Sequence, residues 1–222
     1  MNILSIDTSG TSMYLALQTQ KGLYQYAQLA GLSHSEELLP RIETLVSHGK
    51  IALKDLDLIV VAEGPGSFTG LRIAMATAKG IAIGAGADIV TVSTLDIYGQ
   101  IYGELPYTVL PVIDAKKNQF FGAFYQKGKR ISEYYDAKAD DILAIHNENI
   151  LLTGIDGLLF QNSSSKEYSF LHLTPENTAV TLLEMGYNKW KISGAAPDDA
   201  APVYLRKSEA ELHRDKKKND QS

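Results

Sequence analysis

The sequence predicts an α/β protein in which two copies of a β-β-β-α-β-α-β-α unit follow each other along the chain. Three observations support this fold class. Short apolar runs separated by polar turns occupy residues 2–29, as in a meander of three strands. Residues 56–85 have the pattern of a buried strand, a glycine-rich turn and a helix. The order begins again after residue 104, where Ile113-Asp114-Ala115 ends a strand as Ile6-Asp7-Thr8 ends the first.

The first three strands are expected at residues 2–7, 12–18 and 23–29, because each apolar run is bounded by polar or glycine-containing turns. A helix follows. Ser33 and Glu36 have the spacing of a capping box, in which each side chain satisfies a free N–H at a helix start. Apolar residues then recur at helical spacing, namely Leu38, Leu39, Ile42, Leu45 and Val46. Pro40 lies inside this pattern and predicts a first-turn kink or a shifted start.

The chain is organised around the loop Glu63-Gly64-Pro65-Gly66-Ser67-Phe68-Thr69-Gly70-Leu71-Arg72. A strand with its lead-in precedes it at residues 54–62, and a helix of small and aliphatic residues follows at 73–85. A glycine-rich loop before a helix can hold phosphate. However, the spacing fits neither G-x-x-x-x-G-K-[ST] nor G-x-G-x-x-G. A structural turn is the favoured interpretation, with Ser67 or Thr69 as the helix cap.

The helix at 73–85 carries two shallow ridges of small residues. One ridge consists of Ala74, Ala78 and Ala82, and the other of Ala76, Gly80 and Gly84. Each ridge allows another backbone to approach closely. Glycine inside a helix costs about 1 kcal/mol relative to alanine, which suggests that something packs there. A partner helix and the chain's own sheet are both candidates, and the pattern alone does not choose between them.

A strand at 89–92 and a helix capped by Ser93, running to about residue 103, complete the first unit. The second unit is expected to have strands at 109–114, 119–125, 130–135, 149–153 and 168–171, and helices at 137–146 and 174–185. Thr174 is the cap of the last of these helices, with Pro175 at its first position. An extended connection at 194–202 leads to a closing helix at 208–213. The glycine loop and its small-residue helix are missing from this copy, so the second unit is degenerate.

Two such units in tandem are the ribonuclease-H-like, or actin-like ATPase, architecture, which does not by itself define a function. We expect one domain at 1–104 and a second, degenerate one with a polar tail at 105–222. The net charge of −5 does not favour direct nucleic-acid binding, and the basic run at 214–218 is interpreted as a solvated end. Without cysteines, a signal-peptide pattern or a long apolar run, the chain is expected to be cytoplasmic and not membrane-bound.

A phosphate turn is the first candidate site. Asp7 ends the first strand and is followed by Thr8, Ser9 and Gly10, so these four residues are candidates for holding a nucleotide phosphate. The alternative is an aspartate that closes a β-turn. The matching turn of the second unit, residues 114–117, has no glycine, and residues 151–154 come nearest to a glycine pair for adenosine. A complete nucleotide site is therefore not favoured, and no cofactor is expected.

Other chemistry has weaker support. Asp7, Glu36 and Glu63 would form a nuclease-like carboxylate cluster if they converged, but capping already explains Glu36. The five histidines include no H-x-x-x-H pair, so a helical metal pair is excluded. Ser67 has neither a nucleophile-elbow context nor an evident His or Asp partner. The residues therefore predict no catalytic group and no metal ligand.

Five motifs, in this order, resemble the bacterial TsaB (YeaZ) family. They are Ile6-Asp7-Thr8-Ser9, His34-Ser35-Glu36 with Leu39-Pro40, the stretch Gly64 to Arg72, Pro111-Val112-Ile113-Asp114-Ala115, and Pro202-Val203-Tyr204-Leu205-Arg206. The resemblance covers nearly the whole chain, and the glycine-loop motif is its most specific part. The second half is matched mainly by its first strand and by the closing Tyr-Leu-Arg.

The resemblance implies an actin-like fold and a role in making threonylcarbamoyladenosine in tRNAs that read codons beginning with adenine. It further implies a non-catalytic subunit that pairs with the transferase TsaD, is joined by the ATPase TsaE, forms a homodimer when alone and meets tRNA only through the complex. The family's contacts fall on the first two helices. These match Glu36, Leu39, Ile42, Leu71, Arg72, Met75, Ala78, Lys79 and Ala82. The alternative is an actin-like ATP-dependent phosphotransferase or a peptidase-like enzyme.

Overall fold

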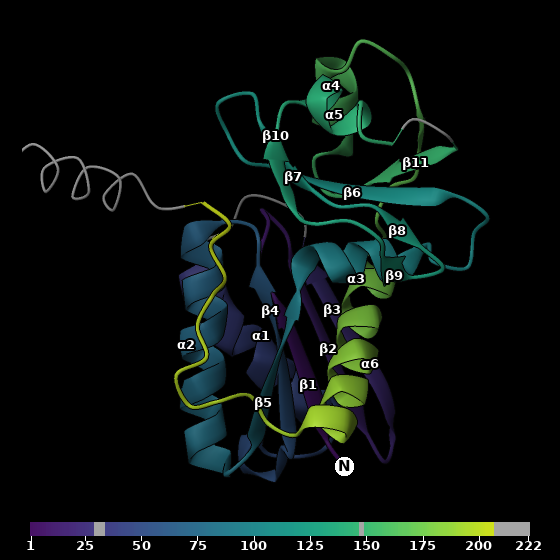
Figure 1. Cartoon of the computed structure of the whole chain (residues 1–222). Helices are drawn as coiled ribbons and strands as arrows, with labels where there is room; N and C mark the ends of the chain where they lie inside the picture. The colour runs from purple at the N-terminus through teal and green to yellow at the C-terminus, as the bar shows by residue number, and fades with distance from the viewer. Residues whose placement is uncertain (29–33, 147–148, 207–222) are drawn as a thin grey trace, which may run out of the picture.

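The computed structural model of the chain describes residues 1–28, 34–146 and 149–206, and it has the predicted α/β class. Figure 1 shows two lobes, each built around a β-sheet. The expected cap at Ser33, the closing helix at 208–213 and the basic run at 214–218 lie outside the described residues. Within the described ranges, no helix combines the length and the apolar content that crossing a membrane requires.

The first sheet has the strand order β3-β2-β1-β4-β5. Its strands are β1 (Ile3–Asp7), β2 (Met13–Thr19), β3 (Gly22–Gln28), β4 (Leu58–Gly64) and β5 (Asp88–Ser93). The β1–β2 and β2–β3 pairs are antiparallel, whereas β1–β4 and β4–β5 are parallel. Tight turns join the antiparallel strands and helical crossovers join the parallel ones. The predicted meander and crossovers are thus confirmed, and the strands lie within two residues of their expected bounds. The exception is the expected lead-in to β4 at 54–57, which is not part of the strand and overlaps a short 3₁₀ helix (Leu53–Asp55).

Helices α1 (His34–His48) and α2 (Phe68–Ala85) cover one face of this sheet, and α3 (Thr94–Ile101) lies against the other. The alternation of side chains along the strands fits this arrangement. Leu4 and Ile6 of β1 pack in the α1–α2 core, whereas Ile3 packs in the core on the α3 side. The expected cap of α3, Ser93, occupies the cap position without a side-chain cap hydrogen bond.

The last helix, α6 (Pro175–Ser193), belongs in sequence to the second half but packs on the first sheet. Its predicted cap is confirmed, because Thr174 Oγ1 accepts the N–H of Asn177 at 3.3 Å. The Ser5 hydroxyl of β1 donates to the carbonyl of Ala179 at 2.9 Å, and Leu182 is fully buried against the sheet. The division at residue 104 therefore separates the two sheets but not the helices that cover them, and as a domain boundary it stays a prediction.

The second sheet repeats the order of the first, as β10-β7-β6-β11-β12. Its strands are β6 (Thr108–Asp114), β7 (Phe120–Gly122), β10 (Tyr135–Ala137), β11 (Ile150–Thr153) and β12 (Ser169–Phe170). The first two pairings, β10–β7 and β7–β6, are antiparallel, and β6–β11 and β11–β12 are parallel. The duplication and its degeneracy are therefore confirmed, and the topology is that of the ribonuclease-H-like, actin-like architecture.

The second lobe differs from expectation in three details. The strands expected at 119–125 and 130–135 are each broken, so that β8 (Tyr125–Gln126) and β9 (Lys129–Arg130) form a hairpin that joins the sheet through the pairing of β8 with β6. At the break the Phe124 N–H donates to Ser132 Oγ at 2.9 Å instead of to a strand. The helix expected at 137–146 is α4 (Ala139–Leu143), which is shorter, and α5 (Gly157–Ser163) was not expected.

Candidate functional site

A cleft of about 680 Å³ lies between the lobes, at the carboxyl ends of β1 and β6. This is where open α/β sheets place their ligands, and the volume falls in the range of about 300–1,000 Å³ that is typical of ligand sites. Both lobes contribute residues to its walls. The first lobe supplies Ser9, Gly10, Thr11, His34, Gly66, Ser67 and Phe68, and the second supplies Ile113, Asp114, Ala115, Lys116, Phe121, Ile155 and Asp156.

The candidate phosphate turn lies in the floor of this cleft. Asp7, Thr8 and Ser9 are at most 1% exposed, and of the four predicted residues only Ser9 and Gly10 line the cleft. Asp7 Oδ1 accepts the N–H of Ser9 at 2.8 Å. Burial raises the pKa of the Asp7 carboxyl, because the surroundings disfavour its charged form. The Ser9 N–H already has an acceptor and is therefore not free to bind a phosphate.

The glycine loop packs directly onto this turn. The Ser67 N–H donates to the carbonyl of Ser9 at 2.6 Å, and Thr8 Oγ1 donates to the carbonyl of Gly70 at 2.8 Å. A Cβ on Gly66 or on Gly70 would collide with the carbonyl oxygen of Ser9 or Thr8, respectively. Ser67 caps α2 as predicted, accepting the Gly70 N–H at 3.2 Å. The geometry supports the structural-turn interpretation: glycine is needed for close backbone packing.

At and beneath the floor, three buried polar atoms have no hydrogen-bond partner among the residues that the structure describes: Asp7 Oδ2, Ser9 Oγ and the Tyr98 hydroxyl of α3. Burial, followed by the nearby charge of Asp7, raises the pKa of Tyr98 well above its ordinary value. The Tyr98 hydroxyl is therefore neutral and able to donate or accept. Sequence reasoning did not identify Tyr98, because its position near Asp7 depends on how α3 packs on the sheet.

The turn of the second lobe is closed on itself. Asp114 accepts the N–H of Lys116 at 2.7 Å and forms an ion pair with Lys116 Nζ at 2.6 Å. Asp156 Oδ2 accepts the N–H of Asp114 at 2.8 Å. Lys116 has a φ of 63°, a conformation in which glycine would be more favourable. The expected weakness of this second turn as a phosphate cradle agrees with these contacts, which occupy its backbone donors.

The carboxylate cluster considered from the sequence is not formed. Asp7 is buried in the cleft floor, whereas Glu36 is exposed in the first turn of α1. Among residues 1–28, 34–146 and 149–206, no three His, Asp or Glu side chains lie close enough together to share a metal ion. A nuclease-like site at these three carboxylates is therefore wrong.

Several residues assigned to a partner surface are instead buried in the chain's own core. This set comprises Ile42, Leu71, Met75, Ala78 and Ala82, each at most 6% exposed. The ridge of Ala74, Ala78 and Ala82 faces the sheet, so the sheet rather than a partner explains its small residues. The cause is helical periodicity, which places residues three and four apart on one face. The assignment of these five side chains to an interface is corrected accordingly.

The surface of α1 and α2 that remains available is different. Glu36, Leu39 and Arg72 are exposed, and Lys79 is partly exposed. The second ridge, formed by Ala76, Gly80 and Gly84, is also exposed. Within the described part of the chain, no heavy atom would lie within 4 Å of a Cβ at Gly80 or Gly84, and the neighbouring Ile83 is 85% exposed. The periodicity revealed this ridge, but not which of the two ridges faces outward.

A segment after α6 runs beside this surface. Residues 194–201, which we call the strap, lie along α2 and the edge of β5 (Figure 1). The Ala196 N–H donates to the carbonyl of Ile89 at 2.7 Å, and Lys79 Nζ donates to the carbonyl of Asp198 at 2.8 Å. Strap and helix enclose a groove of about 400 Å³ that includes Ile83 and Pro197. The expected extended connection is thus one wall of an apolar groove.

Comparisons with known proteins agree with one another. A family model described as TsaD, tRNA N6-adenosine threonylcarbamoyltransferase, matches residues 26–181. The tRNA threonylcarbamoyladenosine biosynthesis protein TsaB of Haemophilus influenzae is 27% identical over 93% of this chain and 94% of its own length. TsaB of Escherichia coli is 33% identical over 57% of this chain and 56% of its own length. YeaZ from Pseudomonas aeruginosa has a TM-score of 0.76 at 24% identity, covering 92% of this chain and 99% of that one, which supports the shared fold.

Proposed function

Since the chain belongs to the TsaB (YeaZ) family of tRNA threonylcarbamoyladenosine biosynthesis proteins, we propose that it is the non-catalytic partner of the TsaD transferase in that modification. The observation that carries the proposal is the match to a TsaB protein along nearly the whole of both chains. We further propose that the complex works in the cytoplasm, on tRNAs that read codons beginning with adenine.

The non-catalytic role is supported by the contacts in the cleft. In the first turn Asp7 accepts the N–H of Ser9 and the glycine loop holds the Ser9 carbonyl, and in the second turn Asp114 and Asp156 accept the N–H groups of Lys116 and Asp114. A nucleotide-dependent enzyme of this architecture needs free backbone donors in both turns. The chain also has no pair of histidines at metal-binding helical spacing. Catalysis would then belong to the partner.

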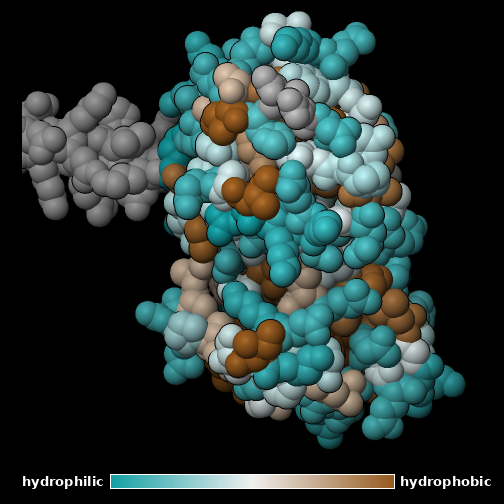
Figure 2. Space-filling view, turned by 45° about the vertical axis from the view of Figure 1, so that its right-hand side comes forward, coloured by the Kyte–Doolittle hydropathy of each residue, from teal (hydrophilic) through white to brown (hydrophobic). Residues whose placement is uncertain are grey.

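The docking surface is proposed on the exposed side of α1 and α2, with Leu39, Arg72, Gly80 and Ile83 at its centre. Open space over Gly80 lets a partner helix approach closely. On the face drawn in Figure 2, hydrophobic residues form separate groups within a mainly hydrophilic surface. The ridge of small residues on α2, next to the 85% exposed Ile83, is a better binding surface for a partner helix than these separate hydrophobic groups are.

The same surface is proposed to pair two copies of the chain when the transferase is absent, and the ATPase TsaE is proposed to join the complex afterwards. The net charge of −5 supports an indirect contact with tRNA through the partner, because phosphate binding depends on lysine and arginine.

Co-purification with the cognate TsaD subunit tests the proposal, using the wild-type chain, Gly80→Trp and Glu184→Trp. Gly80→Trp places a large ring on the ridge without disturbing the fold, since the space there is open. Glu184→Trp is the matched control, because Glu184 is exposed on α6 away from the ridge. We expect the wild type and Glu184→Trp to retain TsaD and Gly80→Trp to lose it.

If Gly80→Trp retains TsaD as well as the wild type does, the docking surface is misplaced. If the wild type does not bind TsaD, the partner role itself fails. In that case, calorimetric titration of the isolated chain with ATP and Mg²⁺ tests the alternative function. Micromolar binding would favour an ATP-dependent enzyme over a partner subunit.

A further inference from the structure

The motif at residues 202–206, which we call the clasp, follows the strap and reaches both lobes at the edge of the cleft. The proposed docking role does not use it. Its residues contact Phe68, Ala115 and Phe121, all of which line the cleft. A five-residue segment thus connects walls of the cleft that come from different sheets.

The first-lobe end of the clasp is held at the glycine loop. The Val203 N–H donates to the carbonyl of Glu63 at 2.7 Å, next to the end of β4. The Tyr204 ring lies 5.0 Å from the ring of Phe68, and its hydroxyl accepts from Arg72 Nε at 3.0 Å. The Arg72 guanidinium lies 3.7 Å from the centre of the Phe68 ring, a cation–π contact.

The second-lobe end is held by one side chain, Arg206. Its Nε donates to Asp136 at 2.7 Å and its Nη2 donates to the other carboxylate oxygen, so the pair is forked. Arg206 also donates to the carbonyl of Ala115 at 2.9 Å and to Gln119 Oε1 at 2.7 Å. Both charged side chains are 27% exposed, so water screens the pair only in part. Forked arginine–carboxylate pairs are among the stronger hydrogen-bonded contacts in proteins.

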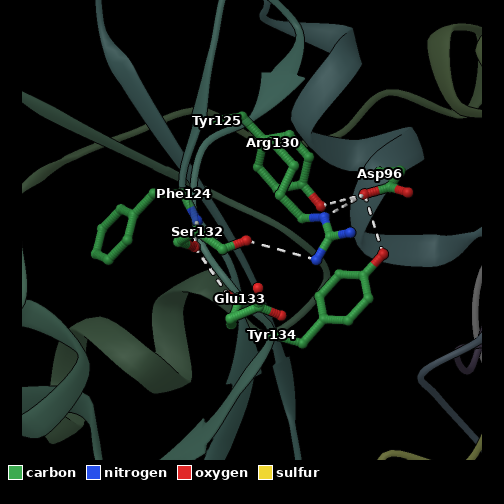
Figure 3. Close-up of polar contacts among 7 residues, drawn as sticks. All are labelled: Asp96, Phe124, Tyr125, Arg130, Ser132, Glu133 and Tyr134. Atoms are coloured by element: carbon green, nitrogen blue, oxygen red, sulfur yellow. Dashed lines mark hydrogen bonds and ion pairs between the residues drawn. The ribbon is translucent and has the colours of Figure 1, made fainter.

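The lobes are tied at a second place, where Figure 3 shows Asp96 of α3 among three side chains of the second lobe. Asp96 Oδ1 accepts from the hydroxyls of Tyr125 and Tyr134 at 2.6 and 3.1 Å, with Arg130 Nε 3.7 Å away. Burial, followed by the charge of Asp96, raises the pKa of Tyr125. This contact adjoins the continuous core that joins Tyr98 and Leu95 to Ile113, so it is the more rigid of the two ties.

We propose that the clasp controls how far the cleft opens. While Arg206 is bound to Asp136 the lobes stay closed, and when this ion pair breaks the second lobe rotates about the Asp96 contact. The asymmetry of the two ties supports this. The Asp96 side is backed by a packed core, whereas on the clasp side one arginine supplies all the hydrogen bonds from the clasp to the second lobe that the described residues show. Losing that side chain therefore weakens one tie and leaves the pivot in place.

Spin-label distance measurements across the cleft test the clasp. The chain has no cysteine, so Lys54→Cys in the first lobe and Glu167→Cys in the second, both exposed positions, give two unique labelling sites. The labelled chain is compared with the same chain carrying Arg206→Ala. Because hydrogen bonds to a charged group are lost, we expect the ratio of open to closed populations to rise about tenfold, as a second, shifted distance population.

Arg41→Ala is the matched control. It also removes an arginine–carboxylate pair, but Arg41 and Glu37, 2.7 Å apart, both lie in α1 of the first lobe. Its distance distribution should equal that of the parent. Asp136→Asn and Arg206→Lys change the side-chain volume less than Arg206→Ala does and should shift the distance distribution by an intermediate amount. They test the proposal if Arg206→Ala does not fold. The proposal would be overturned if the distance distribution were unchanged in the folded Arg206 and Asp136 variants, or if Arg41→Ala shifted it as much as Arg206→Ala does. Neither result depends on TsaD binding.

Discussion

Replacing Gly70 or Gly80 by alanine makes the same chemical change in the same helix, yet the two variants should differ in the sign of their effect on stability. Both glycines lie in α2. Gly80 is exposed, and no heavy atom would lie within 4 Å of a Cβ there. Gly70 is buried, and its Cβ would collide with the backbone carbonyl of Thr8.

The magnitudes follow from these surroundings. Gly80→Ala gains helix propensity without a steric cost, about 1 kcal/mol, which corresponds to a Tm higher by about 2–4 °C in a chain of this size. Gly70→Ala forces overpacking that typically costs about 1–3 kcal/mol, and a backbone carbonyl cannot rotate out of the way as a side chain can. It also weakens the 2.8 Å hydrogen bond from Thr8 to Gly70, worth about 1 kcal/mol. After subtraction of the helix propensity that alanine gains, about 1 kcal/mol, the net loss should be about 2 kcal/mol, and the Tm should fall by about 4–8 °C.

Thermal unfolding followed by circular dichroism measures both shifts. Gly84→Ala is the control. A Cβ at Gly84 would also meet open space, but Gly84 lies one residue from the end of α2, so this substitution should raise the Tm by less than Gly80→Ala does. A Gly70→Ala variant as stable as the wild type would show that the glycine loop does not rest on the Thr8–Ser9 turn. A Gly80→Ala variant that is destabilised would show that the ridge is already covered within the chain.

Three further outcomes test the cleft floor, the α3 contact and the corrected surface. Burial raises the pKa of Asp7 above its usual 3.8, so the native state keeps this proton where the unfolded chain has lost it, and stability falls as pH rises through that range. Urea unfolding should therefore show Asp7→Asn gaining stability relative to the wild type as the pH rises above about 4, the range in which the unfolded chain loses this proton. Tyr125→Phe removes the 2.6 Å hydrogen bond to Asp96 and should cost about 1–3 kcal/mol in the same assay. Ile42→Ala should cost about 2–5 kcal/mol because the side chain is fully buried, whereas Leu39→Ala, 44% exposed, should stay within about 0.5 kcal/mol and weaken TsaD retention instead.

Much of the first lobe could be predicted because its strands are continuous apolar runs between polar turns, and its helices carry caps and helical spacing. The start of α2 inside the glycine loop was predicted through its cap, because Ser67 occupies the cap position and the helix begins at Phe68. The second lobe was less predictable. Its strands β8, β9 and β12 are two residues long, too short for alternation to show. The short helix α5 begins at Gly157, and its N-cap residue Asp156 makes no side-chain cap hydrogen bond, so the start signal is weak.

The orientation of α2 could not be derived from its sequence for a physical reason. Small residues recur on both ridges, so the hydrophobic pattern hardly distinguishes the side that meets the sheet. Only the tertiary packing settles it, by placing Ala74 and Ala78 in the core and leaving Gly80 open. The cleft depends even more on long-range packing, since Ser9, Phe68 and Asp156, which line it, come from parts of the chain that are far apart in sequence.

The duplication explains why the two halves of the sequence are not two independent packing units. Strand by strand, the second sheet repeats the first, so α6 occupies in the second unit the position that α3 occupies in the first. The two helices pack against each other, and α6 extends across β1, β4 and β5 of the first sheet. Gly186 lies so close to Val60 of β4 that a Cβ would collide with it, which is the kind of contact a glycine permits between a helix and a sheet. One face of the first sheet, which α3 covers in part, is therefore fully covered only when the chain beyond Thr174 is in place.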